Sequence, residues 1–155
     1  MPTFITEAEI IKYAQSLIKQ SQTNKNSNVR KVVGEANTHA VETQVYSKYD
    51  PRDYDRRGRN GGLADERNIE VTSVQSSGNT TQVILENLTE GNDSMRGKQI
   101  SDGIEQGDKS MWYNPNGAWS DPRPYVDFMA EQLRNGTELT EALKRDLKNI
   151  GLDVV

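Results

Sequence analysis

The sequence contains no cysteine and only one histidine, His39. The absence of cysteine excludes disulfides, thiolate zinc sites and cysteine nucleophiles. A lone histidine without an acidic partner at ligand spacing favours a position on a helix surface over a catalytic or metal-binding role. The motifs of phosphate-binding loops, dinucleotide-binding folds, EF-hands and serine hydrolases are missing as well. We therefore expect neither enzymatic activity nor a cofactor.

Large apolar residues are scarce. Leu, Ile, Val and Phe together make up 31 of the 155 residues, 20% of the chain, which is close to the composition of disordered proteins. The net charge of -4 is too small to unfold the chain by repulsion. We expect a folded protein with a lean core, whose exposed segments become ordered against neighbouring subunits that bury further apolar surface.

No apolar run approaches the ~20 residues that a membrane-spanning helix needs. The N-terminal stretch also lacks the basic leader and the unbroken apolar core of a signal peptide. A pI near 5.1 argues against a general nucleic-acid-binding domain, which would be basic. These features predict a cytosolic protein that does not contact a membrane.

Helical periodicity at both ends of the chain and alternating residues in the middle predict an α+β fold. We expect N-terminal and C-terminal helices packed on a small antiparallel β-sheet with long loops, in a single domain covering residues 1–155. Its expected parts are a helical region at 6–46, a connector rich in tyrosine and arginine at 47–63, a β-hairpin at 69–88, a loop at 89–123 and C-terminal helices at 124–151.

Several local signals set the expected boundaries. Thr6 and Glu9 form a capping box that starts the first helix. A second helix is expected from Val29 to Tyr46, and residues 75–81 are expected to connect the two strands. Gly151 stands where a left-handed cap would end the last helix.

The connector combines tyrosines and arginines with aspartates, between a proline and a run of glycines. Tyrosine offers rigid contact area with a polar tip and arginine offers a planar fork of donors, and both are enriched at protein interfaces. From Lys48 to Asn60, five positive and three negative charges leave a net charge of only +2, which favours a mixed-charge protein partner over DNA. The expected interface residues here are Tyr49, Pro51, Tyr54, Arg56, Arg57 and Arg59.

A second group of interface candidates precedes or begins the C-terminal helices. Trp112, Tyr113 and Trp119 lie in the long loop, where they either fill the edge of a thin core or form a patch for a partner. Arg123 and Tyr125 flank Pro124, which suits the first turn of a helix.

Carboxylates offer an alternative reading. Asp50, Asp53, Asp55, Asp65 and Glu66 could gather around Mg²⁺ as in nucleases. Each lies near an arginine, however, so surface ion pairs are the favoured interpretation. We expect no metal site.

Taken in order, these features resemble the tail-completion and head-tail joining proteins at the neck of long-tailed bacteriophages. The resemblance covers residues from about 5 to 151, and a long loop at 111–120 departs from the compact pattern. Its motifs are Tyr49-Asp50-Pro51, Tyr54-x-Arg56-Arg57, Gly62-Leu63, the strand pair, Ile104-Glu105-Gln106-Gly107 and Arg123-Pro124-Tyr125.

The resemblance implies a small structural virion protein, without enzymatic activity, that joins the tail to the DNA-filled head. Its implied partners are copies of itself in a ring, usually a hexamer, a head-completion or adaptor protein on the portal side, and a tail-terminator or tail-tube protein. DNA in the lumen would be contacted non-specifically. The implied location is the virion neck, with assembly in the host cytoplasm. The alternatives are a DNA-binding phage regulatory protein and a Mg²⁺-dependent nuclease.

Overall fold

The computed structural model describes residues 3, 6–48, 55–91, 99–107 and 121–154. These residues form helices that flank a two-stranded antiparallel sheet, the α+β arrangement expected from the sequence. The elements are the α-helices α1 (Glu7–Gln22), α2 (Asn28–Ala40), α3 (Ser101–Gln106), α4 (Tyr125–Asn135) and α5 (Glu138–Asn149), the strands β1 (Ile69–Ser77) and β2 (Thr80–Asn87), the π-helix η1 (Val41–Val45), and the 3-10 helices η2 (Tyr46–Lys48) and η3 (Glu66–Asn68).

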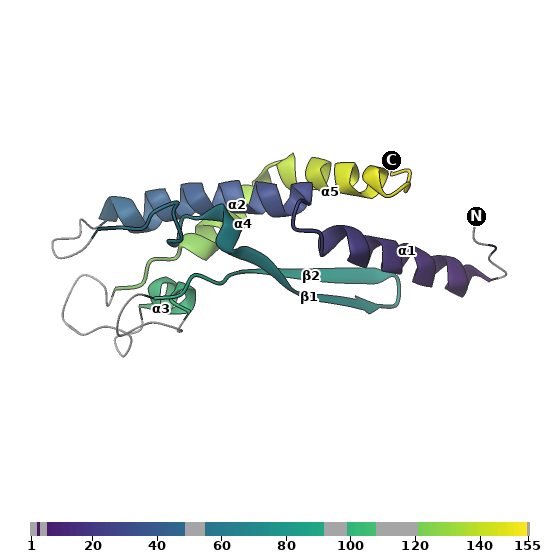
Figure 1. Ribbon diagram of the computed structural model, residues 1–155, viewed down its shortest axis with the longest axis horizontal. Coiled ribbons are helices and arrows are strands. Elements are labelled where there is room, and N and C mark those ends of the chain that lie inside the picture. Colours follow the sequence, from purple (N-terminus) through teal and green to yellow (C-terminus); the bar gives the residue numbers. More distant parts are fainter. Residues whose placement is uncertain (1–2, 4–5, 49–54, 92–98, 108–120, 155) are drawn as a thin grey trace.

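The molecule is elongated (Figure 1). Helices α2 and α5 run along one side, and the β-hairpin extends toward the end where both chain termini lie. Helix α2 packs against α4, α5, η3 and β1, whereas α1 packs against α5 and against both strands. Helix α2 is therefore the element on which the other layers are assembled.

The predicted capping box at α1 is confirmed. The hydroxyl of Thr6 accepts a hydrogen bond from the backbone N–H of Glu9 (3.3 Å), and the Glu9 carboxylate accepts one from the backbone N–H of Thr6 (2.9 Å). Most apolar side chains of this helix are half-buried or exposed, and Ile10 is 52% exposed. Helix α1 therefore starts as its sequence predicts but contributes little to the core.

The second helix was predicted to continue to Tyr46, and this prediction was wrong at its C-terminal end. The α-helix stops at Ala40, after which the chain forms a π turn and then a 3-10 turn. Ala40, Val41 and Val45 are all buried across this change of geometry. Tertiary packing, which a local helix propensity does not include, sets the end of this helix.

The hairpin connection is shorter than predicted. Only Gly78 and Asn79 separate the strands, and Gly78 has the positive φ of 55° that such tight turns require. The strands pair antiparallel with one irregularity, between Val71 and Ser73, where β1 carries an extra residue. The residues from 75 to 81, apart from the two at the turn, belong to the strands.

The core consists of two apolar clusters joined by Met129 of α4, which packs against both. The first cluster contains Ala40, Val41, Val45, Leu63, Ala64, Ile104 and Tyr125, and the second contains Val29, Val33, Ile69 and Ala142. Among the described residues, eleven apolar and eleven polar or charged side chains are buried. Hydrogen bonds must therefore satisfy an unusually large share of this interior.

Gly34 allows η3 to lie directly on α2. A Cβ atom added at Gly34 would lie 2.8 Å from the Cβ atom of Glu66, which belongs to a fixed part of that residue. We expect Gly34→Ala to lower the free energy of unfolding by about 1–2 kcal/mol, because overpacking exceeds the gain of about 1 kcal/mol in helix propensity. Urea denaturation would measure this. Glu35→Ala, at the exposed neighbouring position, is the control and should change stability by less than about 0.5 kcal/mol; an equal or stabilising effect of the Gly34 variant would contradict the close approach.

Candidate interaction site at the arginine-rich connector

The described end of the connector, residues 55–63, folds back onto the C-terminal end of α2 together with the next two residues, Ala64 and Asp65. Leu63 and Ala64 are buried in the first core cluster. The turn before them relies on glycine, because Gly58 and Gly61 have positive φ angles. Gly62 leaves no room for a side chain, since a Cβ atom there would lie 2.6 Å from the carbonyl oxygen of Gly58. The connector is thus a tightly wound turn with its apolar end in the core.

Buried amides hold this turn between α2 and the end of β2. The Asn37 side chain donates to the Leu63 carbonyl (2.9 Å), and the Asn87 side chain donates to the same carbonyl (2.9 Å) and to the Asn37 side chain (3.1 Å). The Asn87 side-chain oxygen accepts from the backbone N–H and the hydroxyl of Thr89. These bonds join segments 50 residues apart in the sequence.

Gly62 is the second anchor of the turn. Its carbonyl accepts hydrogen bonds from the backbone N–H of Asp65 (3.0 Å) and the side chain of Asn68 (3.0 Å), and it lies 3.3 Å from the hydroxyl oxygen of Thr89, whose proton is donated to Asn87. On α2, the hydroxyl of Thr38 donates to the carbonyl of Ala64 (2.8 Å). The backbone of the turn is therefore held from three sides.

Asp65 closes the turn as a buried carboxylate. It accepts hydrogen bonds from the backbone N–H of Gly61 (2.6 Å) and from the backbone and guanidinium of Arg67, the shortest at 2.6 Å. The hydrogen bonds from the Arg67 side chain hold the pKa of Asp65 well below its usual range, although burial of the carboxylate opposes this shift. The oxygens of Asp65 are engaged inside the protein.

We expect Asp65→Asn to lower the free energy of unfolding by about 2 kcal/mol at pH 7, because charged hydrogen bonds to a buried group are lost. The folded-state pKa of Asp65 is lowered, so its ionised form stabilises the fold above the unfolded-state pKa of about 4, and this contribution is lost as the pH falls further. Denaturation of both proteins between pH 7 and pH 3 should therefore show a shrinking difference. Asp55→Asn, at an exposed position of the same segment, is the control. A difference independent of pH would contradict a role for the charge.

The three described connector arginines each make internal contacts. The guanidinium of Arg56 lies over the ring of Tyr46, 4.8 Å from its centroid, and burial raises the pKa of the Tyr46 hydroxyl. Arg57 donates to the carbonyl of Glu90. Arg59 forms an ion pair with Glu42 of η1 at 2.8 Å, yet its side chain remains 70% exposed. Arg59 is therefore the connector arginine best placed to contact another molecule.

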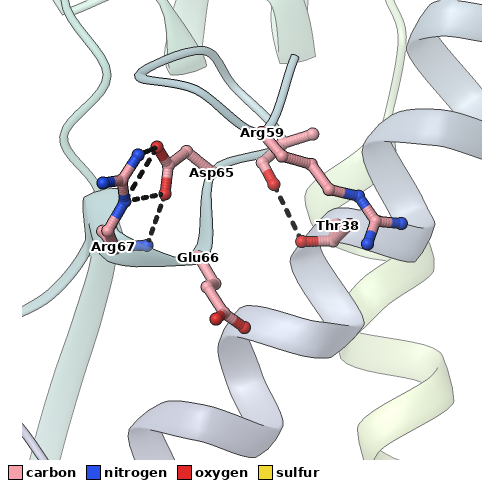
Figure 2. A pocket seen from close by; sticks show the side chains of 6 residues that line it. Thr38, Arg59, Asp65, Glu66 and Arg67 are labelled. Atoms are coloured by element: carbon pink, nitrogen blue, oxygen red, sulfur yellow. Dashed lines mark hydrogen bonds and ion pairs between the residues drawn. The ribbon is translucent and has the colours of Figure 1, made fainter.

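A shallow hollow of about 170 Å³ lies beside the turn (Figure 2). It is lined by Thr38, Arg59, Ala64, Asp65, Glu66 and Arg67. Arg59 and Arg67 come from opposite sides of it, and both side chains are 70% exposed. Its volume is below the range of about 300–1,000 Å³ typical of small-molecule sites. The hollow suits a single side chain of another protein better than a cofactor.

The predicted site residues near the C-terminal helices lie inside the protein. Arg123 is buried, and the fully buried Tyr125 shares a hydrogen bond between its hydroxyl and that of Ser101. Burial raises the pKa of Tyr125. Pro124 precedes α4, whose first turn is capped from α3 because the Glu105 carboxylate accepts from the backbone N–H of Val126 (2.9 Å). In this conformation Arg123 and Tyr125 hold α4 in place and offer almost no surface to a neighbour.

Several predicted residues cannot be placed. Tyr49, Pro51, Tyr54, Trp112, Tyr113 and Trp119 lie outside the described residues, as do Asp50 and Asp53. Within the described ranges, no group of three metal-ligating side chains is close enough to hold a metal ion. His39 is exposed on α2, with its ring 6.1 Å from that of Phe128.

Sequence reasoning missed the polar residues that build the site. Asn37, Asn68, Asn87 and Thr89 lie in three different segments, and no local pattern distinguishes them from surface residues. Asp65 was considered only as a metal ligand or a surface ion-pair partner. Asp65 follows Gly62 by three residues, in a turn before a strand. This position is typical of aspartates that bind backbone N–H groups of a turn, so it could have predicted the structural role of Asp65.

The fold and the site together define a small α+β protein built around a rigid, arginine-lined turn. The YomN family model matches residues 8–149, so the chain belongs to the YomN family. It is 30% identical over 150 residues, covering 94% of this chain and 97% of the relative, to "SPbeta prophage-derived uncharacterized protein YomN" of Bacillus subtilis (strain 168). No solved structure matches. This relative supports an association of the chain with phage.

Among the helices that the structure describes, none is both long and apolar enough to cross a membrane.

Proposed function

We propose that this protein is a structural component of the phage virion, forming a ring at the head-tail junction. The observation that carries the proposal is the match to a prophage-derived protein over nearly the full length of both chains. The neck position itself is suggested by the resemblance of the connector and of the C-terminal helix start to tail-completion proteins. The proposed partners are copies of the chain, an adaptor or head-completion protein and a tail-terminator or tail-tube protein.

The geometry of the connector supports a contact surface rather than a reacting one. The oxygens of Asp65 and the guanidinium of Arg57 are occupied by internal hydrogen bonds. Arg59 and Arg67 also bind carboxylates of the chain, Glu42 and Asp65, but both arginine side chains remain 70% exposed beside the hollow. A rigid backbone that presents flexible charged groups fits recognition of a neighbouring protein, because little of the backbone must become ordered on binding.

These contacts divide the predicted interface residues into two groups. Arg56 and Arg57 pack and hydrogen-bond within the chain, so replacing both with alanine should affect stability as well as assembly. Among the described residues, Arg59 is bound to an exposed glutamate, Glu42, and an exposed ion pair contributes at most about 1 kcal/mol. Arg59 is therefore the residue whose replacement would report on assembly alone.

Inactivation of the gene in its phage tests the proposal. We expect DNA-filled heads and separate tails, visible by electron microscopy, with infectivity restored by the wild-type gene supplied in trans. Native mass spectrometry of the purified chain, alone and with its neck partners, should give a ring of defined mass. Intact, infectious particles that lack the protein would refute the structural role. Binding to DNA with a steep salt dependence, without any assembly, would instead favour a regulatory protein.

Reversing the charge at position 59 tests whether Arg59 contacts a neighbouring protein in the assembly. Arg59→Glu should leave the melting temperature within about 2 °C of the wild type, as expected for an exposed side chain, but should reduce restoration of infectivity at least about tenfold. Arg145→Glu, at an exposed position of α5, is the matched control and should restore infectivity fully. Equal behaviour of the two variants would remove Arg59 from the interface.

A further inference from the structure

The two edges of the β-hairpin differ in how they are protected. On β1, the extra residue between Val71 and Ser73 interrupts the regular pairing, and Arg30 of α2 donates to the carbonyl of Ile69 at 2.5 Å. Helix α2 also packs against this strand. Bulges and covering elements are the usual means by which proteins prevent pairing at a sheet edge. The β1 edge is therefore poorly suited to accept another strand.

Within the described residues, the β2 edge is less protected, because α1 is the helix that packs against β2 and it contacts both strands. Its eight residues, Thr80–Asn87, include no proline, lysine or arginine, and the extra residue of the β1–β2 pairing belongs to β1 and not to β2. In the described part of the chain, no backbone hydrogen bond from outside the hairpin reaches residues 80–86. An antiparallel pair leaves every second N–H and C=O of each strand pointing away from its partner. Strand β2 thus offers a row of open backbone donors and acceptors.

We propose that this edge pairs with the same edge of a second copy of the chain, β2 against β2, in antiparallel orientation. The sequence of β2 is compatible with itself in this arrangement. With Val83 opposite its copy, Glu86 faces Thr80, Gln82 faces Ile84 and no charges of the same sign meet. A parallel pair in register would place Glu86 beside Glu86, so the antiparallel pair is favoured.

The position of helix α1 is a second argument that the partner at the β2 edge is another copy of the chain. It contacts both strands of its own hairpin, and the Gln15 side chain donates to the carbonyl of Gly78 at the tip (2.8 Å). In the pair, the two α1 helices would lie over one continuous sheet, two strand spacings or about 10 Å apart. This is close to the 8–10 Å at which helices pack. Ile10 and Tyr13 of α1 are 52% and 39% exposed, so this helix carries apolar surface that the single chain leaves uncovered.

The pair also completes the sheet. A two-stranded hairpin alone is marginally stable, whereas four strands with a shared apolar face form an ordinary sheet. Thr81, Val83 and Leu85, which alternate along the inner face of β2, are each only half-buried in the single chain. This contact is twofold, so it closes a pair and cannot by itself form a ring. The inference therefore does not rest on the proposed function.

Two lysine variants on the purified full-length chain test the edge. Gln82 of β2 and Gln75 of β1 are exposed cross-strand neighbours, so they form a matched pair on the two edges. We expect a concentration-dependent dimer by analytical ultracentrifugation, whose dissociation constant rises at least about tenfold in Gln82→Lys. Gln75→Lys should leave it within about twofold. Circular dichroism melts would show that both variants fold.

Single cysteines provide a second readout, because the chain has none of its own. Under mild oxidation, Val83→Cys or, in the neighbouring register, Ile84→Cys should give disulfide-linked dimers, whereas Gln75→Cys should not. A chain that stays monomeric at its solubility limit would overturn the inference. So would a dimer or ring that Gln82→Lys leaves unchanged, in which case a ring of defined mass would still support the proposed function.

Discussion

Replacing Asn87 with leucine is expected to lower the free energy of unfolding by about 3–5 kcal/mol, because it leaves several buried polar groups without partners. The side-chain N–H groups of Asn87 donate hydrogen bonds to the side-chain oxygen of Asn37 and to the carbonyl of Leu63. The side-chain oxygen of Asn87 accepts one from the backbone N–H of Thr89, and all of these residues are buried. In the variant, the backbone N–H of Thr89 and the side-chain oxygen of Asn37 lose the partners that they have in the wild type. Chemical denaturation at pH 7 would give the difference.

A control is needed because leucine also changes strand propensity. Gln75→Leu makes a similar exchange on the exposed part of the neighbouring strand and should change stability by less than about 0.5 kcal/mol. A double-mutant cycle with Asn37→Ala would then show coupling between the two amides. If Asn87→Leu were as mild as the control, the amide network would not be what holds the connector turn.

Features encoded by neighbouring residues were predicted well. The capping box at Thr6 and Glu9 and the left-handed glycine at Gly151 after α5 both follow from short sequence patterns, and the structure contains both. The α+β class followed in the same way from the switch between helical and alternating periodicity. In these segments the local preference and the tertiary structure agree.

Features that depend on contacts across the chain were not predicted. The change from α-helix to π turn after Ala40 and the burial of Tyr125 both depend on packing between distant segments. The connector shows the same limit at the candidate site. Its composition indicated contact residues, but only the structure separates Arg59, which is largely exposed, from Arg57, which binds Glu90. A sequence gives the chemistry of a side chain and not the direction in which it points.

The difference between the hydrogen-bonded turn and the exposed arginines that extend from it bears on how the protein recognises a partner. The lean core is compensated by polar bonds that converge on one turn, so the turn is stiff even though it lies at the surface. A stiff turn fixes the positions from which Arg59 and Arg67 extend, and fixed positions give a contact its register. Stability of the turn and specificity of assembly are therefore expected to change together in variants of the network, including Arg67, which holds Asp65, and separately in variants of Arg59.

The second large effect is expected at Asp146, a buried carboxylate of α5 that caps the N-terminus of α2. It accepts hydrogen bonds from the backbone N–H groups of Asn28 (2.8 Å) and Val29 (3.0 Å) and from the Asn28 side chain (2.7 Å). The hydroxyl and carbonyl of Ser27 accept from the next two N–H groups, those of Arg30 and Lys31. The Lys31 bond is the first within the helix, and the N–H of Ser27 donates to the carbonyl of Asn24 (3.0 Å). All four N–H groups without a partner in the helix, those of residues 27–30, are thus satisfied, two of them by a residue more than 100 positions away.

We expect Asp146→Ala to lower the free energy of unfolding by about 3 kcal/mol, because the half-buried N–H of Asn28 and the buried N–H of Val29 lose their acceptor and the positive end of the helix loses a negative charge. Asp146→Asn should cost less, since its amide oxygen can still accept. Ser27→Ala, which removes the local cap of the same helix, is the comparison and should cost about 1 kcal/mol. Denaturation monitored by circular dichroism would rank the three variants. A loss at Asp146 no larger than that at Ser27 would mean that α5 is held to α2 by its apolar contacts, through Ala142, and that the long-range cap adds little.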